Sequence, residues 1–416
     1  MLLLAATAIT ANSQATTSDE KLRLLMERSS KQAAGSAPVQ SAAGLPPERL
    51  KERAELLVKG ELDLANLHVD AAQQAFEKAA LILHAADSEM ALVRSYMQAG
   101  EYRRALGFGA HTAGAHLDVV GGTALYAWLL NVGGQEAVAQ RLLDDTLTRM
   151  PNSTLIKSAQ QQLASGTPLA TGELLALPLR LAPYSALIKL PKGAHIASSA
   201  MLLADSSGTS ASSRFALVPF KTTDSNQTQR WVRNGLGQVS AAKVAQRLPS
   251  LGLAVVRLAV PLPLPDGLAP AMNEAFPGSA AYAVQYPKTP GKPMIDAAWP
   301  QLHIGFVGGM AAPANVASQD RLLGVKLPNE ARGGPVFNAA GQWIGVAVQA
   351  DSAQGDFLVT TAQLAKAIGA NASKFGLVSR PSAPTAGVLA GAAPAMAADR
   401  IYEASLKTAL QVISSH

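Results

Sequence analysis

Hydrophobic and small residues recur at helical spacing from residue 46 to residue 168. The pattern repeats, because Gly100 is followed five positions later by Ala105, and Gly134 five positions later by Ala139. The two glycines are 34 residues apart, and an earlier partial copy reads LHVDAAQQAFEKAA. Small residues let antiparallel helices approach closely, and glycine permits the turn between them. The sequence therefore predicts stacked helical hairpins over residues 46–168.

The pattern changes near Thr167, where short runs of β-type residues begin, separated by Gly, Pro and Ser. Ten such runs predict an antiparallel β domain over residues 176–372. They read ALIKL, HIASSAMLL, RFALVPF, GLAVVRLAV, AYAVQY, LHIGFVG, RLLGVKL, PVFN, WIGVAVQ and DFLVTT.

Residues 373–416 contain a Pro- and Ala-rich linker and then a last amphipathic segment. Its apolar residues lie at helical spacing, which predicts a final helix with one apolar face. These residues are Tyr402, Leu406, Leu410 and Ile413.

Residues 1–45 are expected to form a flexible leader. The start, MLLLAATAITANSQA, resembles the apolar core of a secretory signal, but it has no positively charged residue before that core. The apolar stretch is too short to span a bilayer. We expect a periplasmic or exported protein, with a cytoplasmic one as the alternative.

Composition narrows the function classes. A hydrophobic content of 48% in 416 residues is enough for two or three cores. The net charge of +6 is spread along the chain without a basic run interleaved with aromatics, so nucleic-acid binding is not expected. The absence of cysteine excludes disulfides and thiolate chemistry. No phosphate-binding loop is present, and we expect no cofactor and no metal.

The helical pattern resembles the tetratricopeptide repeat family over roughly three copies. The match is weaker in the middle copy, where Gly109 and Thr112 depart from the expected residues. Any alanine-rich stack of helical hairpins would give a similar pattern. The resemblance implies an array with a concave face that binds peptides or helices of other proteins.

The segment Glu330–Val348, EARGGPVFNAAGQWIGVAV, resembles the nucleophile loop and following strands of trypsin-like serine proteases, and most closely those of the HtrA type. It keeps Gly333, Gly334 and Pro335, which in isolation would be a simple turn. The resemblance implies an α+β protein in which the helical array precedes a double β-barrel and a C-terminal helix.

The resemblance also implies that all three members of the catalytic triad are absent. Arg332 stands at the position of the nucleophilic serine, and a guanidinium cannot attack a carbonyl. Met201 stands at the position of the general base, and Gly252 at that of the orienting aspartate. Glu330 replaces a glycine of the oxyanion hole, where its charge would oppose a developing anion.

Other candidates for chemistry are weaker. His195 with Ser198 or Ser199 is an alternative nucleophilic pair, although a barrel-surface role for His195 is favoured. His68, His84, His111 and His116 lie in the helical part. The spacing of five between His111 and His116 does not suit one helix face, so we expect no metal site there.

The sequence thus favours a non-catalytic adaptor or scaffold. Its partners would be proteins or peptides, bound by the helical groove and by a barrel cleft that includes Glu330, Arg332, Gly333 and Gly334. We expect Arg332 to pair with Glu330 or with a carboxylate of the partner. The alternatives are a divergent active serine hydrolase and a structural subunit of a cell-envelope complex.

Overall fold

A computed structural model describes most of the chain in ten stretches, and the account below concerns these residues. They are 44–166, 168–204, 211–220, 229–271, 274–287, 296–310, 321–327, 332–349, 355–377 and 394–415. The predicted leader and its signal-like segment lie almost wholly outside the described residues. None of the described helices is both long and apolar enough to cross a membrane.

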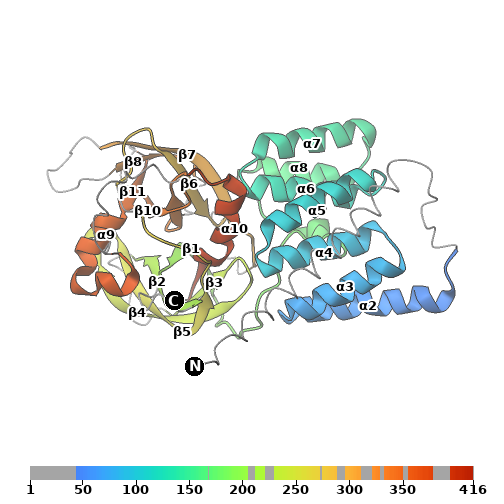
Figure 1. Cartoon of the computed structure of the whole chain (residues 1–416), viewed down its shortest axis with the longest axis horizontal. Coiled ribbons are helices and arrows are strands. Elements are labelled where there is room, and N and C mark those ends of the chain that lie inside the picture. Colours follow the sequence, from blue (N-terminus) through green and yellow to red (C-terminus); the bar gives the residue numbers. More distant parts are fainter. Residues whose placement is uncertain are drawn as a thin grey trace, which may run out of the picture.

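The N-terminal part is the predicted helical array, which lies on one side of the molecule (Figure 1). Consecutive helices pack against one another as hairpins. The helices are α2 (Pro47–Ala65), α3 (Val69–Ile82), α4 (Ala86–Ala99), α5 (Tyr102–Ala115), α6 (Val120–Val132), α7 (Glu136–Arg149) and α8 (Thr154–Ala164).

The repeated small residues have the expected role in this array. Ala72, Ala105 and Ala139 lie in α3, α5 and α7, and none is exposed to solvent. Gly100 and Gly134 follow α4 and α6 with φ angles of 81° and 84°, a left-handed backbone that glycine adopts without strain. The 34-residue spacing therefore reflects one helical hairpin per repeat.

The second part consists of two closed six-stranded barrels. The first has the strand order β1-β12-β3-β4-β5-β2, and the second β10-β11-β8-β7-β6-β9. The strands are β1 (His195–Leu202), β2 (Ser212–Pro219), β3 (Gln229–Asn234), β4 (Val239–Leu248), β5 (Leu253–Pro263), β6 (Ala280–Gln285), β7 (Gln301–Met310), β8 (Arg321–Gly324), β9 (Pro335–Phe337), β10 (Trp343–Gln349), β11 (Asp356–Thr360) and β12 (Ala409–Ser415).

Nine of the ten predicted runs form strands, and two details of the predicted β domain were wrong. The run ALIKL, residues 186–190, has no regular structure. Strands β3 and β4 were not predicted, although they complete the first barrel. The array and the double barrel were predicted correctly.

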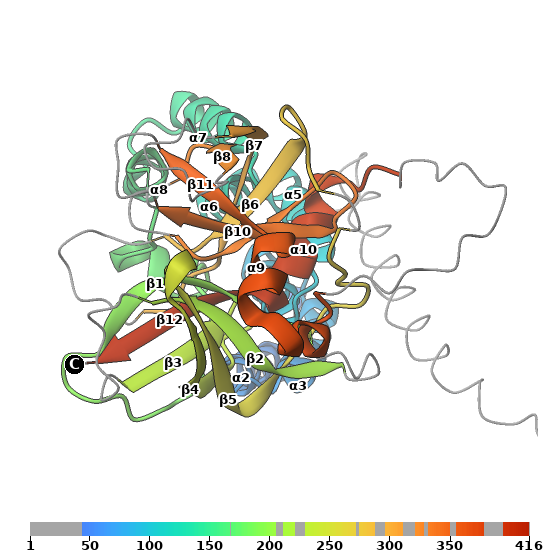
Figure 2. The same cartoon turned by 90° about the vertical axis from the view of Figure 1, so that its left-hand side faces the viewer.

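The C-terminal segment differs most from the expectation. Helix α10 (Ala398–Thr408) includes Tyr402 and Leu406 but ends at Thr408, and the chain continues as strand β12. Figure 2 shows β12 between β1 and β3, and it pairs with both in antiparallel register. Leu410 and Ile413, which were assigned to the helix, therefore lie in this strand. Both are fully buried.

Helix α10 lies between the barrels and the array (Figure 1). The ring of Tyr402 packs edge-on against that of Tyr102 in α5, with centroids 4.5 Å apart. Its hydroxyl donates to the carbonyl oxygen of Pro300 at 2.7 Å. Glu403 pairs with Arg103 of α5 at 3.1 Å. One helix thus contacts both halves of the molecule.

The segment 168–184 covers the first helices of the hairpins. The side-chain amide of Gln98 in α4 donates to the Tyr184 carbonyl oxygen at 3.0 Å and accepts from its N–H at 2.9 Å. The Tyr184 hydroxyl donates to Glu61 of α2 at 3.1 Å. Trp128 of α6 shares a small cavity with Leu181. A partner approaching this face would have to displace part of the chain itself.

The position of β12 generates a prediction. We expect a chain ending after Thr408 to lose cooperative folding of the first barrel, because β1 and β3 would both lose their hydrogen-bonded neighbour. Burial of each aliphatic side chain such as Leu410 contributes about 1.5–3 kcal/mol. Thermal unfolding followed by near-UV circular dichroism measures the effect. Removal of His416 alone is the control, and equal melting of the two truncated chains would contradict the assignment of β12.

Candidate functional site

The proposed triad positions lie around the junction of the two barrels. Along β1, Ala200 and Leu202 point into the first barrel, because they belong to its interior cluster. Met201 points the other way and packs, fully buried, in the cluster that joins the barrels to the helices. Its thioether is therefore a packing group in this position. The assignment of Met201 to the general-base position remains a prediction.

Gly252 lies at an exposed turn immediately before β5. Its carbonyl oxygen accepts a hydrogen bond from the N–H of Phe220 at 2.8 Å, which fixes the end of β2 against the start of β5. Its φ angle of 62° is left-handed. The residue therefore serves the backbone turn and supplies no charge to the junction.

The backbone of Arg332, Gly333 and Gly334 connects the two barrels. The Arg332 carbonyl oxygen accepts from the N–H of Ser199 at 3.1 Å. The Gly333 N–H donates to the carbonyl oxygen of Ala347 at 2.8 Å. The Gly334 N–H donates to the side-chain oxygen of Gln285 at 3.1 Å. The loop is thus held by β1, β10 and the end of β6.

Both glycines are required by this close approach. A Cβ at Gly333 would lie 2.2 Å from the Ser199 carbonyl oxygen and 2.4 Å from Cγ of Pro219, and φ is 106°. A Cβ at Gly334 would lie 2.0 Å from the carbonyl oxygen of Val284. The Gly-Gly-Pro signature therefore has a structural cause that is independent of catalysis.

The Arg332 side chain forms an ion pair with Asp356, the first residue of β11. Both side chains are nearly buried, with 13% and 11% of their surfaces exposed. Asp356 was not among the partners expected for Arg332, and the expectation that Arg332 binds a partner's carboxylate stays a prediction. Glu330, the other expected partner, lies outside the described residues.

The alternative pair of His195 with Ser198 or Ser199 is not supported by the geometry. Ser199 is fully buried, and its Oγ accepts the N–H of Tyr286 at 2.8 Å, a contact between the barrels. Nε2 of His195 lies 3.5 Å from Oγ of a different residue, Ser414, its neighbour across β12. Ser414 was not among the sequence candidates, because only the strand pairing brings it to His195.

One titratable group near the loop has a perturbed pKa. Burial lowers the pKa of His303 in β7 to about 4, and the positive charge of Arg332 adds to this effect. Its Nε2 is enclosed without a hydrogen-bond partner among the described residues, although the residue as a whole is half-buried. The imidazole is therefore neutral at pH 7.

Comparison with known proteins agrees with this architecture. Residues 192–346 match the family model of the trypsin-like peptidase domain, from just before β1 into β10. The match and the two closed barrels define a trypsin-like domain joined to an N-terminal helical array. No curated protein sequence matches the chain.

Two solved structures are similar at 17% sequence identity. The protease domain of MamO from Magnetospirillum magneticum, in its apo form, has a TM-score of 0.31, and the match covers 42% of this chain and 90% of that chain. The serine endoprotease from Yersinia pestis has a TM-score of 0.28, and the match covers 41% of this chain and 55% of that chain.

The ion pair at the loop generates a second prediction. Asp356→Ala should lower the free energy of unfolding by about 1–3 kcal/mol, because it leaves the nearly buried Arg332 without its carboxylate. Replacing both residues, by Arg332→Met and Asp356→Leu, should restore most of the loss. Chemical denaturation measures both effects. The exposed Asp266→Ala is the control, and a D356A protein as stable as this control would refute the pair's contribution.

Proposed function

We propose that this chain is a non-catalytic scaffold that binds another protein. The observation that carries the proposal is the ion pair of Arg332 with Asp356. It occupies the loop position where the resemblance to trypsin-like proteases requires a free serine hydroxyl. A side chain that is protonated at all physiological pH values and already paired cannot act as nucleophile or base.

The two other proposed triad positions support the same conclusion. Met201 is buried as a packing residue, and a thioether is not a useful base. Gly252 has no side chain with which to orient an imidazole. Restoring the serine alone would therefore not restore hydrolysis, since a lone hydroxyl at neutral pH is a weak nucleophile.

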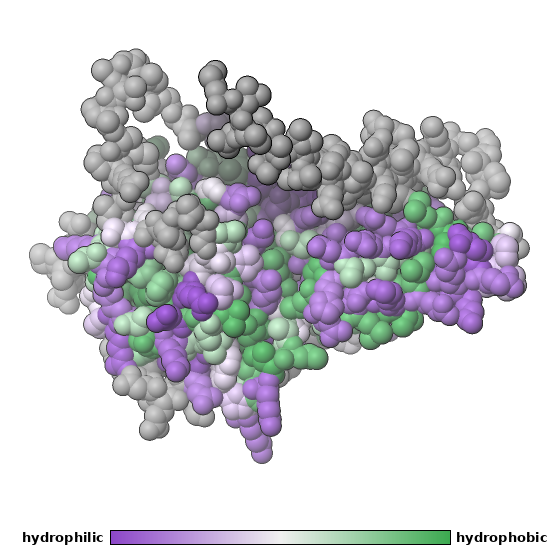
Figure 3. Space-filling model, turned by 60° about the horizontal axis from the view of Figure 1, so that its bottom comes forward, coloured by the Kyte–Doolittle hydropathy of each residue, from purple (hydrophilic) through white to green (hydrophobic). Residues whose placement is uncertain are grey.

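The surface available to a partner differs from the one expected from the repeats. Segment 168–184 contacts α2, α4 and α6, so the chain itself occupies part of a groove on that face. The outer surface of the first hairpin is a better candidate, because Val58 and Leu62 lie one turn apart on α2 and are 62% and 61% exposed. Figure 3 shows hydrophobic residues interspersed with hydrophilic ones on this face of the molecule. We place the partner contact there.

An exported location fits a scaffold of this kind and is part of the proposal. It rests on the signal-like residues at the start of the sequence and on the resemblance to HtrA-type proteases. Fractionation of cells that produce the full chain would test it.

The catalytic half of the proposal is tested by labelling. We expect a fluorophosphonate probe to label no serine of the full chain, and casein to remain intact, both in the wild type and in Arg332→Ser. Trypsin labelled in parallel is the positive control. Covalent labelling of the wild type that disappears in Ser199→Ala or Ser414→Ala would instead establish a serine hydrolase.

The binding half is tested by cross-linking the full chain in an extract of its native cells, with mass spectrometry to identify partners. We expect one partner to be captured by the wild type and lost in the double variant Val58→Ser and Leu62→Ser. Val260→Ser is the matched control, because Val260 is also an exposed valine, at 58%, but lies on β5. Equal capture by all three proteins would exclude α2 as the contact.

A further inference from the structure

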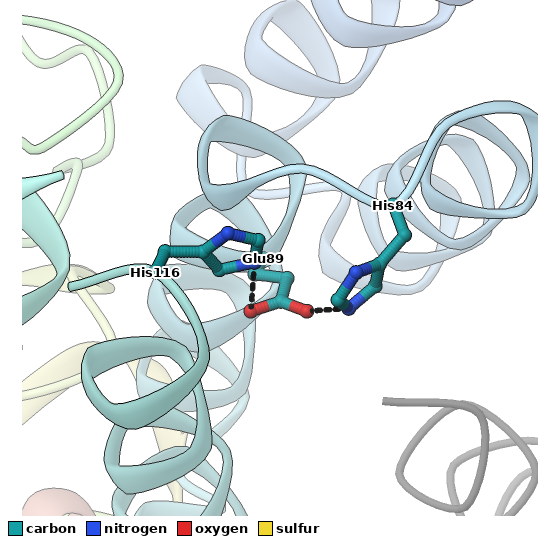
Figure 4. A group of neighbouring side chains, drawn as sticks. All are labelled: His84, Glu89 and His116. Carbon is teal, nitrogen blue, oxygen red and sulfur yellow. Dashed lines mark ion pairs between the residues drawn. The ribbon is translucent and has the colours of Figure 1, made fainter. Parts of the chain in front are cut away.

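Three histidines converge on one carboxylate at one end of the helical array. His84 lies in the connection between α3 and α4, and Glu89 lies in the first turn of α4. His111 lies in α5, and His116 is the residue that ends this helix. Figure 4 shows the rings of His84 and His116 on either side of the Glu89 carboxylate.

The distances between these groups are unusual for hydrogen bonds. Nε2 of His111 lies 3.6 Å from one carboxylate oxygen of Glu89, and Nε2 of His116 lies 3.4 Å from the other. Both Nε2 atoms are buried without a hydrogen-bond partner among the described residues. His84 forms an ion pair with Glu89 directly. The Nε2 atoms of His111 and His116 therefore face the carboxylate without a hydrogen bond to it, and a buried polar atom that makes no hydrogen bond needs an explanation.

A metal ion explains this arrangement. Zinc binds imidazole nitrogen and carboxylate oxygen at about 2.0–2.2 Å in tetrahedral geometry, which places two ligand atoms about 3.4 Å apart. The separations of 3.4 and 3.6 Å at His116 and His111 are close to that value, whereas His84 lies nearer to the carboxylate and would have to move away from it to share an ion. The ligand atoms of His84, Glu89 and His116 all lie within 4.8 Å of one another.

We propose that His84, Glu89 and His116 bind a divalent cation of the zinc type, and that His111, which lies 3.6 Å from the carboxylate but outside this mutually close group, shifts to complete the coordination. Three imidazoles with one carboxylate suit zinc and its neighbours cobalt, nickel and copper, whereas magnesium and calcium prefer oxygen ligands. Four protein ligands without an open position are typical of a structural site. This inference goes beyond the proposed scaffold function and does not depend on it.

The electrostatics of the cluster favour a cation. Only 1% of the Glu89 side chain is exposed. A buried carboxylate needs a positive charge beside it, which here either a bound cation or a protonated imidazole can supply.

The ion would fasten three helix ends to one another: the end of α3, the start of α4 and the end of α5. The histidine side chains are 13–18% exposed, so an ion can reach them from solvent without unfolding of the array. The alternative is a cluster in which protonated imidazoles alone compensate Glu89. Such a cluster would bind no metal, so a metal-binding measurement distinguishes it from the proposed site.

The test uses the full chain without an affinity tag, stripped of metal by a chelator. Calorimetric titration with zinc sulfate should show one ion per chain, with a rise in the thermal midpoint. His84→Ala and His116→Ala should each weaken binding by more than the roughly 10-fold that loss of an outer-shell partner costs. The matched control is His68→Ala, a histidine of the same array with a 69% exposed side chain.

A second measurement protects the test against variants that fail to fold. X-ray absorption of the zinc-loaded wild type should show nitrogen and oxygen neighbours with the scattering pattern of several imidazoles. Glu89→Gln, which keeps the shape of the side chain, should also weaken binding. Failure to bind zinc stoichiometrically, binding unchanged in all cluster variants, or a spectrum without imidazole would overturn the proposal.

Discussion

The closure of the first barrel by the last strand of the chain is the constraint on which the rest of the structure depends. Strand β12 is hydrogen-bonded between β1 and β3, so the barrel is complete only when the C-terminus has returned to it. Helix α10, directly before β12, is thereby held between the array and the barrels. The contacts of Tyr402 with Tyr102 and Pro300 follow from this placement. The array and the two barrels therefore form one connected body with a continuous core.

In the loop of Arg332, Gly333 and Gly334, the residues that packing requires differ from the residue whose side chain carries a charge. Glycine is required at positions 333 and 334 because other parts of the backbone lie very close. A Cβ at Gly333 would collide with the carbonyl oxygen of Ser199, and a Cβ at Gly334 with that of Val284. The residue before them contributes its carbonyl oxygen to the junction, a group that every amino acid has. The fold therefore does not require a particular side chain at position 332, and the charge of Arg332 is compensated by Asp356.

The sequence could predict what depends on local periodicity and could not predict what depends on pairing between distant segments. The 34-residue spacing and nine strands were evident from the pattern. Strand β12 was not, because Tyr402, Leu406 and Leu410 continue a spacing of four across the end of the helix. The histidine cluster was missed because α5 ends at Ala115, which allows His116 to turn back toward Glu89.

The array also shows why a repeat pattern alone does not identify a binding face. In an open solenoid the first helix of each hairpin exposes one side to solvent or to a ligand. Here almost every residue of α4 and α6 is buried, because segment 168–184 and the barrels occupy that side. Segment 168–184 therefore lies where a bound peptide would lie in an open array. This contact orients the barrels relative to the array. At one end of the array the outer side of α2 stays accessible, because Val58 and Leu62 are exposed there.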